Sequence, residues 1–460
     1  NGLTTPLVGD VDGDGKAEIL ACAADTAAST GSSILVFDGQ DGTLKYTLNV
    51  QRYSTAGQLM SFADINGDGT AEFFLLADDG YAYCYNATTG AQLWRSSVRI
   101  DARYLPMIAD LNADNHPELV CGPYIFNAAN GLILLHGTQE ASGRGYGAPH
   151  TEVGEGRSYY MQALADIDRD GEQEICAGNT IYKPILANPN GEEGNTWQGL
   201  RTADTHDDIV GYDGQTFIAD FDHDGDMDIC VVGFRETNKA DLYVWDGQTS
   251  LLVGYYNVSM SNSYGGNMTP SIPFCGDLDG DGTPEILFNH PDGMRAFSYS
   301  ATAPNHISLM HFATQFGETA GFTVFDFNRD GTSEIVYRGT EQLSILDGAS
   351  LTSLSTPVTS YSGTLTEYPV VADVNGDGHA EIIVAHTNLS WDNGDPRGKI
   401  TVYGSMDNNW NSARSVWNQW VYNSVCINED LTVPRHQYDI ASVYSNGTEP
   451  FNGFLRQMAL

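Results

Sequence analysis

The sequence is poor in basic residues. Its 460 residues include 60 acidic side chains against 21 Lys and Arg, and only five are Lys, so the formal charge is −39. Such a surface repels nucleic acid and anionic membranes. The sequence also lacks an apolar run of about 18 residues that could span a membrane as a helix. We therefore expect no nucleic-acid partner and no direct membrane insertion.

Cysteines are few, and no helical period persists along the chain. The seven cysteines form no CxxC pair, which argues against a zinc site and a complete disulfide framework. Four of them, Cys22, Cys121, Cys176 and Cys230, occupy similar places in apparent strands, which favours small buried apolar side chains. Fifty glycines between short apolar runs indicate many short strands joined by tight turns.

Catalytic motifs are also missing. The chain has no nucleophile elbow, no HExxH and no phosphate-binding glycine loop. His206 stands beside Asp207 and Asp208, an ordinary arrangement in an acidic surface loop. The sequence therefore predicts no catalytic residue, and we expect a protein that is not an enzyme.

A nine-residue acidic pattern recurs eight times, with starts 46 to 57 residues apart. We number these segments loops 1 to 8. Every copy has Asp at position one, Asp or Asn at three, Asp at five and an acid at nine. In order they read DVDGDGKAE, DINGDGTAE, DLNADNHPE, DIDRDGEQE, DFDHDGDMD, DLDGDGTPE, DFNRDGTSE and DVNGDGHAE.

Strand patterns surround each loop. A short apolar run such as 107–109 precedes it and another such as 19–22 follows, then a third strand with a turn (34–39) and a fourth strand (44–50). Four antiparallel strands in about 50 residues make one propeller blade, and a lone blade cannot bury both of its faces. The sequence predicts an all-β fold, a β-propeller of eight four-stranded antiparallel blades. The alternative is seven blades plus a C-terminal extension.

The loop pattern suits calcium, a hard cation that takes six to eight oxygens. Positions one, three, five and nine would supply side-chain oxygens and position seven a backbone carbonyl. Gly at position six, or Asn115 in loop 3, permits a left-handed backbone. The last acid of an EF-hand comes at position twelve between helices, and magnesium prefers to keep its waters. We predict up to eight Ca²⁺ ions.

The predicted metal ligands, including the position-seven residues that would act through their carbonyls, are these: Asp10, Asp12, Asp14, Lys16 and Glu18; Asp64, Asn66, Asp68, Thr70 and Glu72; Asp110, Asn112, Asp114, His116 and Glu118; Asp166, Asp168, Asp170, Glu172 and Glu174; Asp220, Asp222, Asp224, Asp226 and Asp228; Asp277, Asp279, Asp281, Thr283 and Glu285; Asp326, Asn328, Asp330, Thr332 and Glu334; Asp373, Asn375, Asp377, His379 and Glu381.

The eight loops between strands resemble the FG-GAP/VCBS repeats of integrin-type propellers and bacterial surface proteins. The resemblance covers residues 1–404 and implies the propeller fold and calcium binding. Its members include adhesins, receptors, structural modules and some polysaccharide lyases, so it leaves the activity open.

The C-terminal segment, 405–460, has a narrower resemblance. Its stretches 416–419 (VWNQ) and 428–434 (NEDLTVP) are similar to a segment that follows such repeats in large secreted surface proteins of Bacteroidetes. This resemblance implies one domain of a larger cell-surface polypeptide with neighbouring domains. We expect residues 405–460 to close the propeller or pack on it. Because the first loop starts at Asp10, the segment is also a candidate to supply a strand of the first blade.

Candidate binding residues come from irregular insertions at 137–160, 188–215, 257–271 and 386–398, because loops on a rigid scaffold often carry function. Aromatic faces suit sugars, and Arg suits carboxylates. The residues are Arg144, Tyr146, Arg157, Tyr159, Arg201, His206, Tyr264 and Trp391. The expected function is a calcium-stabilised extracellular, cell-surface adhesion module that binds a glycan or a surface protein. The alternatives are a calcium-dependent polysaccharide lyase and a rigid spacer.

Overall fold

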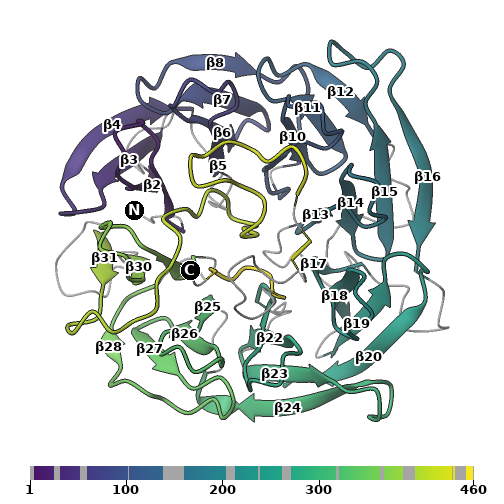
Figure 1. The fold of residues 1–460 in the computed structure, drawn as a ribbon, viewed down its shortest axis with the longest axis vertical. Helices are drawn as coiled ribbons and strands as arrows, with labels where there is room; N and C mark the ends of the chain where they lie inside the picture. The colour runs from purple at the N-terminus through teal and green to yellow at the C-terminus, as the bar shows by residue number, and fades with distance from the viewer. Residues whose placement is uncertain are drawn as a thin grey trace.

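A computed structural model gives the fold of the chain (Figure 1). It describes residues 5–24, 32–51, 60–101, 103–137, 160–203, 213–236, 239–261, 271–316, 321–362, 367–386, 399–437, 439–440 and 452–458. The helical structure in these residues is one 3-10 turn, Thr314–Phe316. No helix in them is long enough and apolar enough to span a membrane.

Eight antiparallel sheets follow one another around a ring (Figure 1). The first four contain β1 (Leu7–Gly9), β2 (Glu18–Ala24), β3 (Ser32–Asp38) and β4 (Leu44–Val50); β5 (Met60–Ala63), β6 (Glu72–Leu76), β7 (Ala82–Asn86) and β8 (Gln92–Arg95); β9 (Met107–Ala109), β10 (Glu118–Cys121), β11 (Tyr124–Asn127) and β12 (Ile133–His136); and β13 (Ala163–Ala165), β14 (Glu174–Ala177), β15 (Thr180–Ile185) and β16 (Thr196–Thr202).

The other four sheets have the same strand order. They contain β17 (Gln215–Ala219), β18 (Asp228–Glu236), β19 (Lys239–Asp246) and β20 (Leu252–Ser259); β21 (Phe274–Gly276), β22 (Glu285–His290), β23 (Gly293–Tyr299) and β24 (Ile307–Ala313); β25 (Phe322–Phe325), β26 (Glu334–Arg338), β27 (Gln342–Leu346) and β28 (Val358–Thr359); and β29 (Val370–Ala372), β30 (Glu381–His386) and β31 (Lys399–Tyr403).

The predicted fold is confirmed: the chain is an all-β, eight-bladed propeller. Each of the first seven blades has four strands in sequence order, and the eighth has three within the described residues. One prediction about the insertions is wrong, because β16 (Thr196–Thr202) lies inside the segment 188–215 that we expected to be irregular. It completes the fourth blade by pairing with β15.

Burial decreases from the inside of each blade to its outside. The inner strands, such as β5 and β9, are buried along their whole length, whereas β8 on the outside is mostly exposed. All seven cysteines are buried and none is in a disulfide, as expected of small apolar side chains. The buried side chains form a core that continues around the ring, because each blade buries its faces against its neighbours.

The C-terminal segment, which we call the tail (405–460), crosses the middle of the ring (Figure 1). Trp417 and Val8 of β1 exchange two backbone hydrogen bonds of 2.8 and 2.9 Å. Farther along, Phe454 bonds Cys275 of β21 in the same way, at 3.1 and 3.2 Å. The tail is thereby attached to two blades that are not neighbours, blades 1 and 6.

Side chains of the tail continue this attachment to the other blades. Asn418 Nδ2 donates to the carbonyl of Phe62 at 3.0 Å, and Gln419 Oε1 accepts from the amide of Ile108 at 3.1 Å. Gln457 Nε2 donates to the carbonyl of Val371 at 3.0 Å. The innermost strands would otherwise present unpaired backbone groups at the centre, and the tail satisfies several of them.

The tail does not supply the first strand of the first blade, so that expectation is wrong. Blade 1 takes all four of its strands from its own repeat, beginning with β1. Trp417 pairs with β1 only as an isolated bridge. The first and eighth blades meet directly, with Gln40 Nε2 donating to the carbonyl of Asn375 at 3.4 Å.

Candidate metal centre

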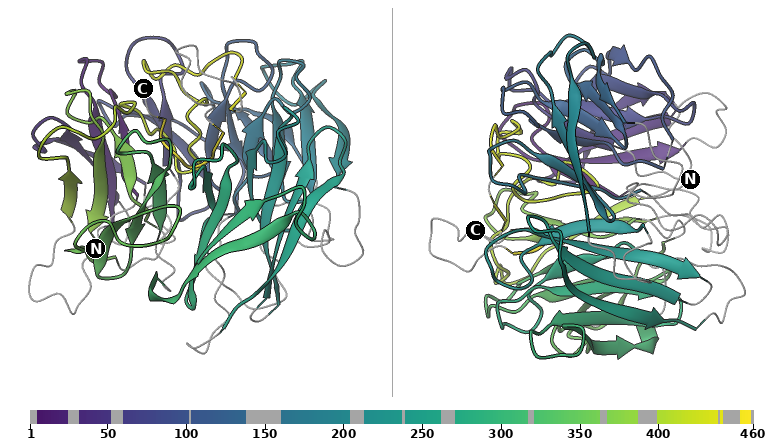
Figure 2. Two further views of the ribbon diagram at one scale, coloured as in Figure 1. Left: turned by 60° about the horizontal axis from the view of Figure 1, so that its bottom comes forward. Right: turned by 90° about the vertical axis from the view of Figure 1, so that its right-hand side faces the viewer.

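Each acidic loop connects the first strand of a blade to the second. Position one follows the inner strand directly, and position nine is the first residue of the second strand in all eight blades. The turns after the third strands lie at the same end, since Gly39 N donates to Ala17 O at 3.0 Å and Gly247 N to Met227 O at 3.2 Å. Loops and turns therefore share one face. The tail lies over the centre of that face, where Asp373 N donates to Arg414 O at 3.0 Å (Figure 2).

Three hydrogen bonds recur in all eight loops. The position-one carboxylate accepts from the amide of position six at 2.8–3.2 Å. The position-five carboxylate accepts from the amide of position seven at 2.8–3.0 Å. The position-nine carboxylate accepts from the amide of position two at 2.7–3.4 Å. These bonds fix the acids of each loop around a common centre.

The backbone is left-handed at position six, as the sequence predicts. It is also left-handed at a second position that the sequence pattern did not indicate. Position six has φ of 66° at Asn115 and between 83° and 93° at the glycines. Position four is also left-handed in every loop, although only half of the copies have Gly there. The others are Ala113, Arg169, His223 and Arg329, with φ of 55–65°. The hydrogen-bonded loop imposes this conformation on residues that do not favour it.

In four loops the carboxylates of positions one, three and nine converge, with one oxygen of each within 4.8 Å of the others. These are the loops with Asp at position three, and their groups are Asp10, Asp12 and Glu18; Asp166, Asp168 and Glu174; Asp220, Asp222 and Asp228; and Asp277, Asp279 and Glu285. Position five is not in these groups. A ligand role for position five and for the position-seven carbonyl stays a prediction.

Buried oxygens in these loops fit a cation. Glu285 Oε1 and Asp220 Oδ1 are buried and have no hydrogen-bond partner among the described residues, and the same holds for Asp12 Oδ1 and Asn112 Oδ1. Burial raises the pKa of Glu285 to about 9 and that of Asp220 to about 6. A carboxyl with a pKa of about 9 holds a proton at neutral pH unless a positive charge lies beside it. A bound cation would supply that charge and use the unpaired oxygens.

Asn at position three changes the arrangement in loops 2, 7 and 8. There the amide Nδ2 of Asn66, Asn328 and Asn375 donates to the position-nine carboxylate at 3.1, 2.7 and 2.9 Å. Burial raises the pKa of each of these Glu side chains to about 7. An amide group also has an oxygen, so the same side chain can turn its other end toward a cation.

Two lysines that the loop pattern did not include point into loops 1 and 4. Lys45 Nζ lies 2.7 Å from Asp12 Oδ2 and 2.9 Å from both Asp14 Oδ2 and Glu18 Oε1. Lys183 Nζ lies 2.6–2.9 Å from the corresponding acids, Asp168, Asp170 and Glu174. The scarcity of lysine was the one sequence signal that could have drawn attention to them.

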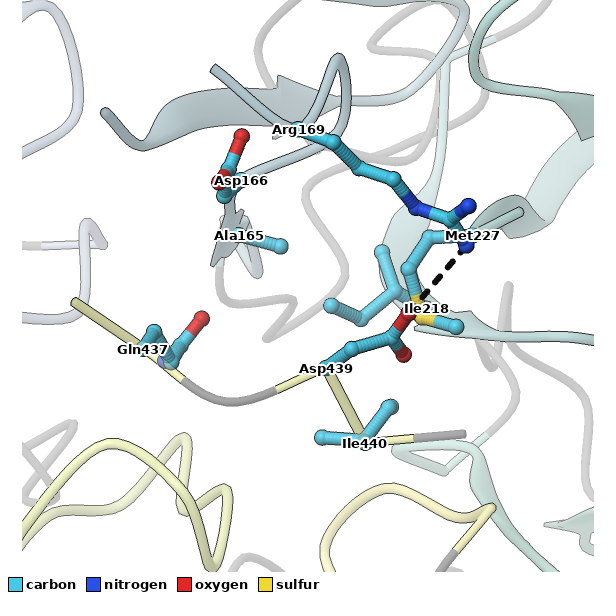
Figure 3. A pocket seen from close by; sticks show the side chains of 8 residues that line it. All are labelled: Ala165, Asp166, Arg169, Ile218, Met227, Gln437, Asp439 and Ile440. Atoms are coloured by element: carbon cyan, nitrogen blue, oxygen red, sulfur yellow. Dashed lines mark hydrogen bonds and ion pairs between the residues drawn. The ribbon is translucent and has the colours of Figure 1, made fainter. Parts of the chain in front are cut away.

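A cavity of about 420 Å³ lies between blades 4 and 5 and the tail. Arg169 is the basic side chain in its wall, and it forms ion pairs with Asp226 at 3.0 Å and with Asp439 of the tail at 3.3 Å. Figure 3 shows Arg169 and Asp439 approaching across the cavity. Since this guanidinium already has two carboxylate partners, it offers little to an acidic ligand.

Seven of the eight predicted ligand-binding residues fall in segments that the structure does not describe. Arg144, Tyr146, Arg157, Tyr159, His206, Tyr264 and Trp391 lie outside the described residues. The backbone of Arg201 belongs to β16 and pairs with Ile181, so this residue is part of a blade and not of an irregular loop.

The comparisons with known proteins agree with the repeat geometry. The FG-GAP-like repeat matches residues 10–75, 220–288 and 326–384, and each match begins at position one of an acidic loop. The chain carries FG-GAP-like repeats. No curated protein matches it.

Among solved structures, the FG-GAP-like propeller is similar to the biofilm matrix protein Bap1 of V. cholerae, with a TM-score of 0.65 and 16% identity over 99% of this chain and 95% of that one. It also matches BamB from Moraxella catarrhalis, with a TM-score of 0.46, 10% identity, and 82% and 92% of the chains covered. A europium-containing methanol dehydrogenase matches with a TM-score of 0.47, 13% identity, and 84% and 83% covered. At these identities the likeness concerns the fold.

Proposed function

We propose that this protein is a calcium-stabilised propeller of the cell exterior that acts as a non-catalytic binding module for a glycan or a surface protein. The observation that carries the proposal is the set of acidic loops, because in four of them the carboxylates of three positions converge and leave buried oxygens unpaired. Oxygen-only ligands in a loop of fixed shape favour calcium over softer metals. Calcium at about millimolar concentration outside cells would fill sites of the weak extracellular class.

The architecture supports a binding role more than a catalytic one. The loop face is partly covered by the tail, so the opposite face is the one left for a large ligand. The strand ends that flank three of the predicted insertions, 137–160, 257–271 and 386–398, lie at that opposite end. Bap1, which has a similar structure, is a biofilm matrix protein, and this fits an extracellular module. Neighbouring domains of a larger chain would then place this surface.

The metal content tests the calcium part of the proposal. Protein dialysed against equal millimolar concentrations of calcium and magnesium is expected to retain calcium, measured by elemental mass spectrometry. Glu285→Gln should lower the bound calcium by about one ion, because the neutral amide removes a charged ligand from loop 6. Glu193→Gln, at an exposed acid outside the loops, is the matched control. Protein that retains magnesium or no metal would refute this part.

Retention on polysaccharides tests the binding part. The protein in calcium is passed over immobilised acidic and neutral polysaccharides, and the same polysaccharides are analysed by mass spectrometry after incubation with it. Retention of the protein with intact polysaccharide chains supports the proposal. The double variant Arg144→Ala/Trp391→Ala should be retained less than the wild type, whereas Gln40→Ala on the loop face should be retained equally. Shortened chains with unsaturated ends would instead indicate a lyase. Intact chains without retention would exclude these glycans as ligands.

A further inference from the structure

Lysine is rare in this protein, and two of its five lysines enter acidic loops. Lys45 comes from β4, the outer strand of blade 1, and Lys183 from β15, the third strand of blade 4. Both reach the carboxylates of positions three, five and nine. The same arrangement therefore arises twice, from two different strand positions.

We propose that the ammonium groups of Lys45 and Lys183 are the resident cations of loops 1 and 4, so that the protein binds six calcium ions and not eight. This inference rests on the proposed function, because it concerns which of the eight loops take metal. It changes the expectation from the repeat pattern, in which all eight loops look equivalent.

The chemistry of the ammonium group matches the position it occupies. An ammonium has three N–H donors and no acceptor, and each of these two groups contacts three carboxylates. The Lys183 side chain is only 9% exposed, and Glu174 beside it is fully buried. A divalent ion would have to displace the ammonium and leave it without these partners, which is costly for a buried charge.

The remaining loops lack such a group. Among the ion pairs of the described residues, no other lysine or arginine contacts the acids of positions three, five or nine. Loops 5 and 6 keep buried oxygens without a hydrogen-bond partner, at Asp220 and Glu285. Loops 1 and 4 have such oxygens too, at Asp12 and Glu174, but there Lys45 and Lys183 supply the positive charge. Loops 2, 7 and 8 hold an Asn amide, which can present an oxygen, whereas a lysine cannot.

The two lysines also enter loops that have an acid at every side-chain ligand position. Loops 1, 4, 5 and 6 have acids at all four of positions one, three, five and nine, and the other four loops have Asn at position three. A tethered ammonium would neutralise part of this charge at any calcium concentration. Blades 1 and 4 would thus fold and persist without metal in their loops, while the other blades depend on it.

Counting the bound ions tests the inference. Native mass spectrometry of protein equilibrated with calcium should give six ions for the wild type, seven for Lys45→Met or Lys183→Met, and eight for the double variant. Met keeps most of the side-chain volume and removes the charge. Lys239→Met, at an exposed lysine beginning β19, is the control and should keep six. A second measurement is thermal melting, in which the two loop variants should lose more stability than the wild type when calcium is chelated.

Each alternative outcome has a distinct meaning. A wild type that binds eight ions, or a count that does not rise by one with each Lys→Met substitution, would overturn the inference while leaving the calcium proposal intact. A wild type and variants that all bind no calcium would overturn the proposed function itself. If a loop variant is too unstable to purify, its count is taken from Lys→Gln at the same position, whose amide is neutral and polar.

Discussion

The glycine at position six shows how single residues set the shape of a loop. Gly282 has φ of 87°, and a Cβ added to it would meet nothing within 4 Å. Any cost of Gly282→Ala therefore comes from the backbone, and we expect a loss of about 1–2 kcal/mol in the free energy of unfolding. Gly282→Asn should cost less, because Asn115 adopts this conformation in loop 3.

Urea denaturation in calcium measures this difference. Gly137→Ala serves as the control, because Gly137 has no positive φ and an added Cβ would have its nearest neighbour at 3.6 Å. Equal stability of Gly282→Ala and the wild type would show that position six does not need its left-handed backbone.

A buried charge cluster in blade 6 gives a pH-dependent prediction at the same scale. Arg295 donates to both carboxylate oxygens of Asp292 at 2.7 and 2.8 Å, and His290 lies 2.8 Å from it. Burial alone would raise the pKa of Asp292, but the hydrogen bonds from Arg295, Ser261 and His290 outweigh it and lower the pKa to about 2. The carboxylate therefore stabilises the fold above its unfolded pKa near 4, and this contribution disappears as the pH falls toward 2.

Asp292→Asn should consequently cost about 2 kcal/mol at neutral pH, with a deficit that shrinks below about pH 4. Urea midpoints of the variant and the wild type, compared at several pH values between 3 and 7, measure it. Because both proteins carry the same other acids, their difference isolates this site. A deficit that does not change with pH would mean that the carboxylate charge contributes nothing.

At the scale of elements, local patterns could be predicted and distant contacts could not. The strand expected at 44–50 is β4, and the loop conformation at Asn115 follows from its place in the repeat. Lys45 lies 27 residues from Glu18, and Asn418 lies 356 residues from Phe62. No spacing rule links such pairs, because the fold brings them together only after the blades have formed a ring.

The tail gives a prediction about one of these distant contacts. Asn452 Oδ1 accepts from the amide of Asp220 at 2.9 Å, and its Nδ2 donates to the carbonyl of the same residue at 2.5 Å. Asn452→Ala would leave the backbone N–H and C=O of Asp220 unpaired, at a cost of about 2–4 kcal/mol. Asn452→Asp keeps an acceptor for the amide of Asp220 but loses the donor to its carbonyl. It should therefore cost less than Asn452→Ala only if the new carboxyl group is protonated and can donate to that carbonyl.

Thermal and urea unfolding measure the effect of Asn452→Ala, with exposed Asn190→Ala as the control. Limited proteolysis gives a second measurement, because a tail detached from blade 5 should be cut earlier. A variant with the stability and the proteolysis rate of the wild type would mean that this contact does not hold the tail to the ring.

The whole molecule combines a strong negative charge with a closed ring. Eight acidic loops meet at one face of a protein with a formal charge of −39, and they are linked by backbone bonds such as Ala71 N to Val11 O at 3.0 Å. Repulsion among the loops opposes this packing. Bound cations, the two lysines and the tail all act against that repulsion. Of these, only the bound cations can be removed by changing the solution.

Chelation should therefore destabilise the ring as a unit. For sites with a dissociation constant of about 10⁻⁴ M at about 2 mM calcium, each bound ion contributes roughly 1.8 kcal/mol, so excess EDTA should lower the Tm by about 10 °C or more. Concentrated NaCl should restore part of this loss in EDTA, because it shortens the Debye length to about 3 Å at 1 M and screens the loop carboxylates from one another. The same salt should change the Tm much less in calcium. Scanning calorimetry measures all four conditions, with calcium-saturated EDTA as the control, and an unchanged Tm in excess chelator would show that metal does not hold this ring together.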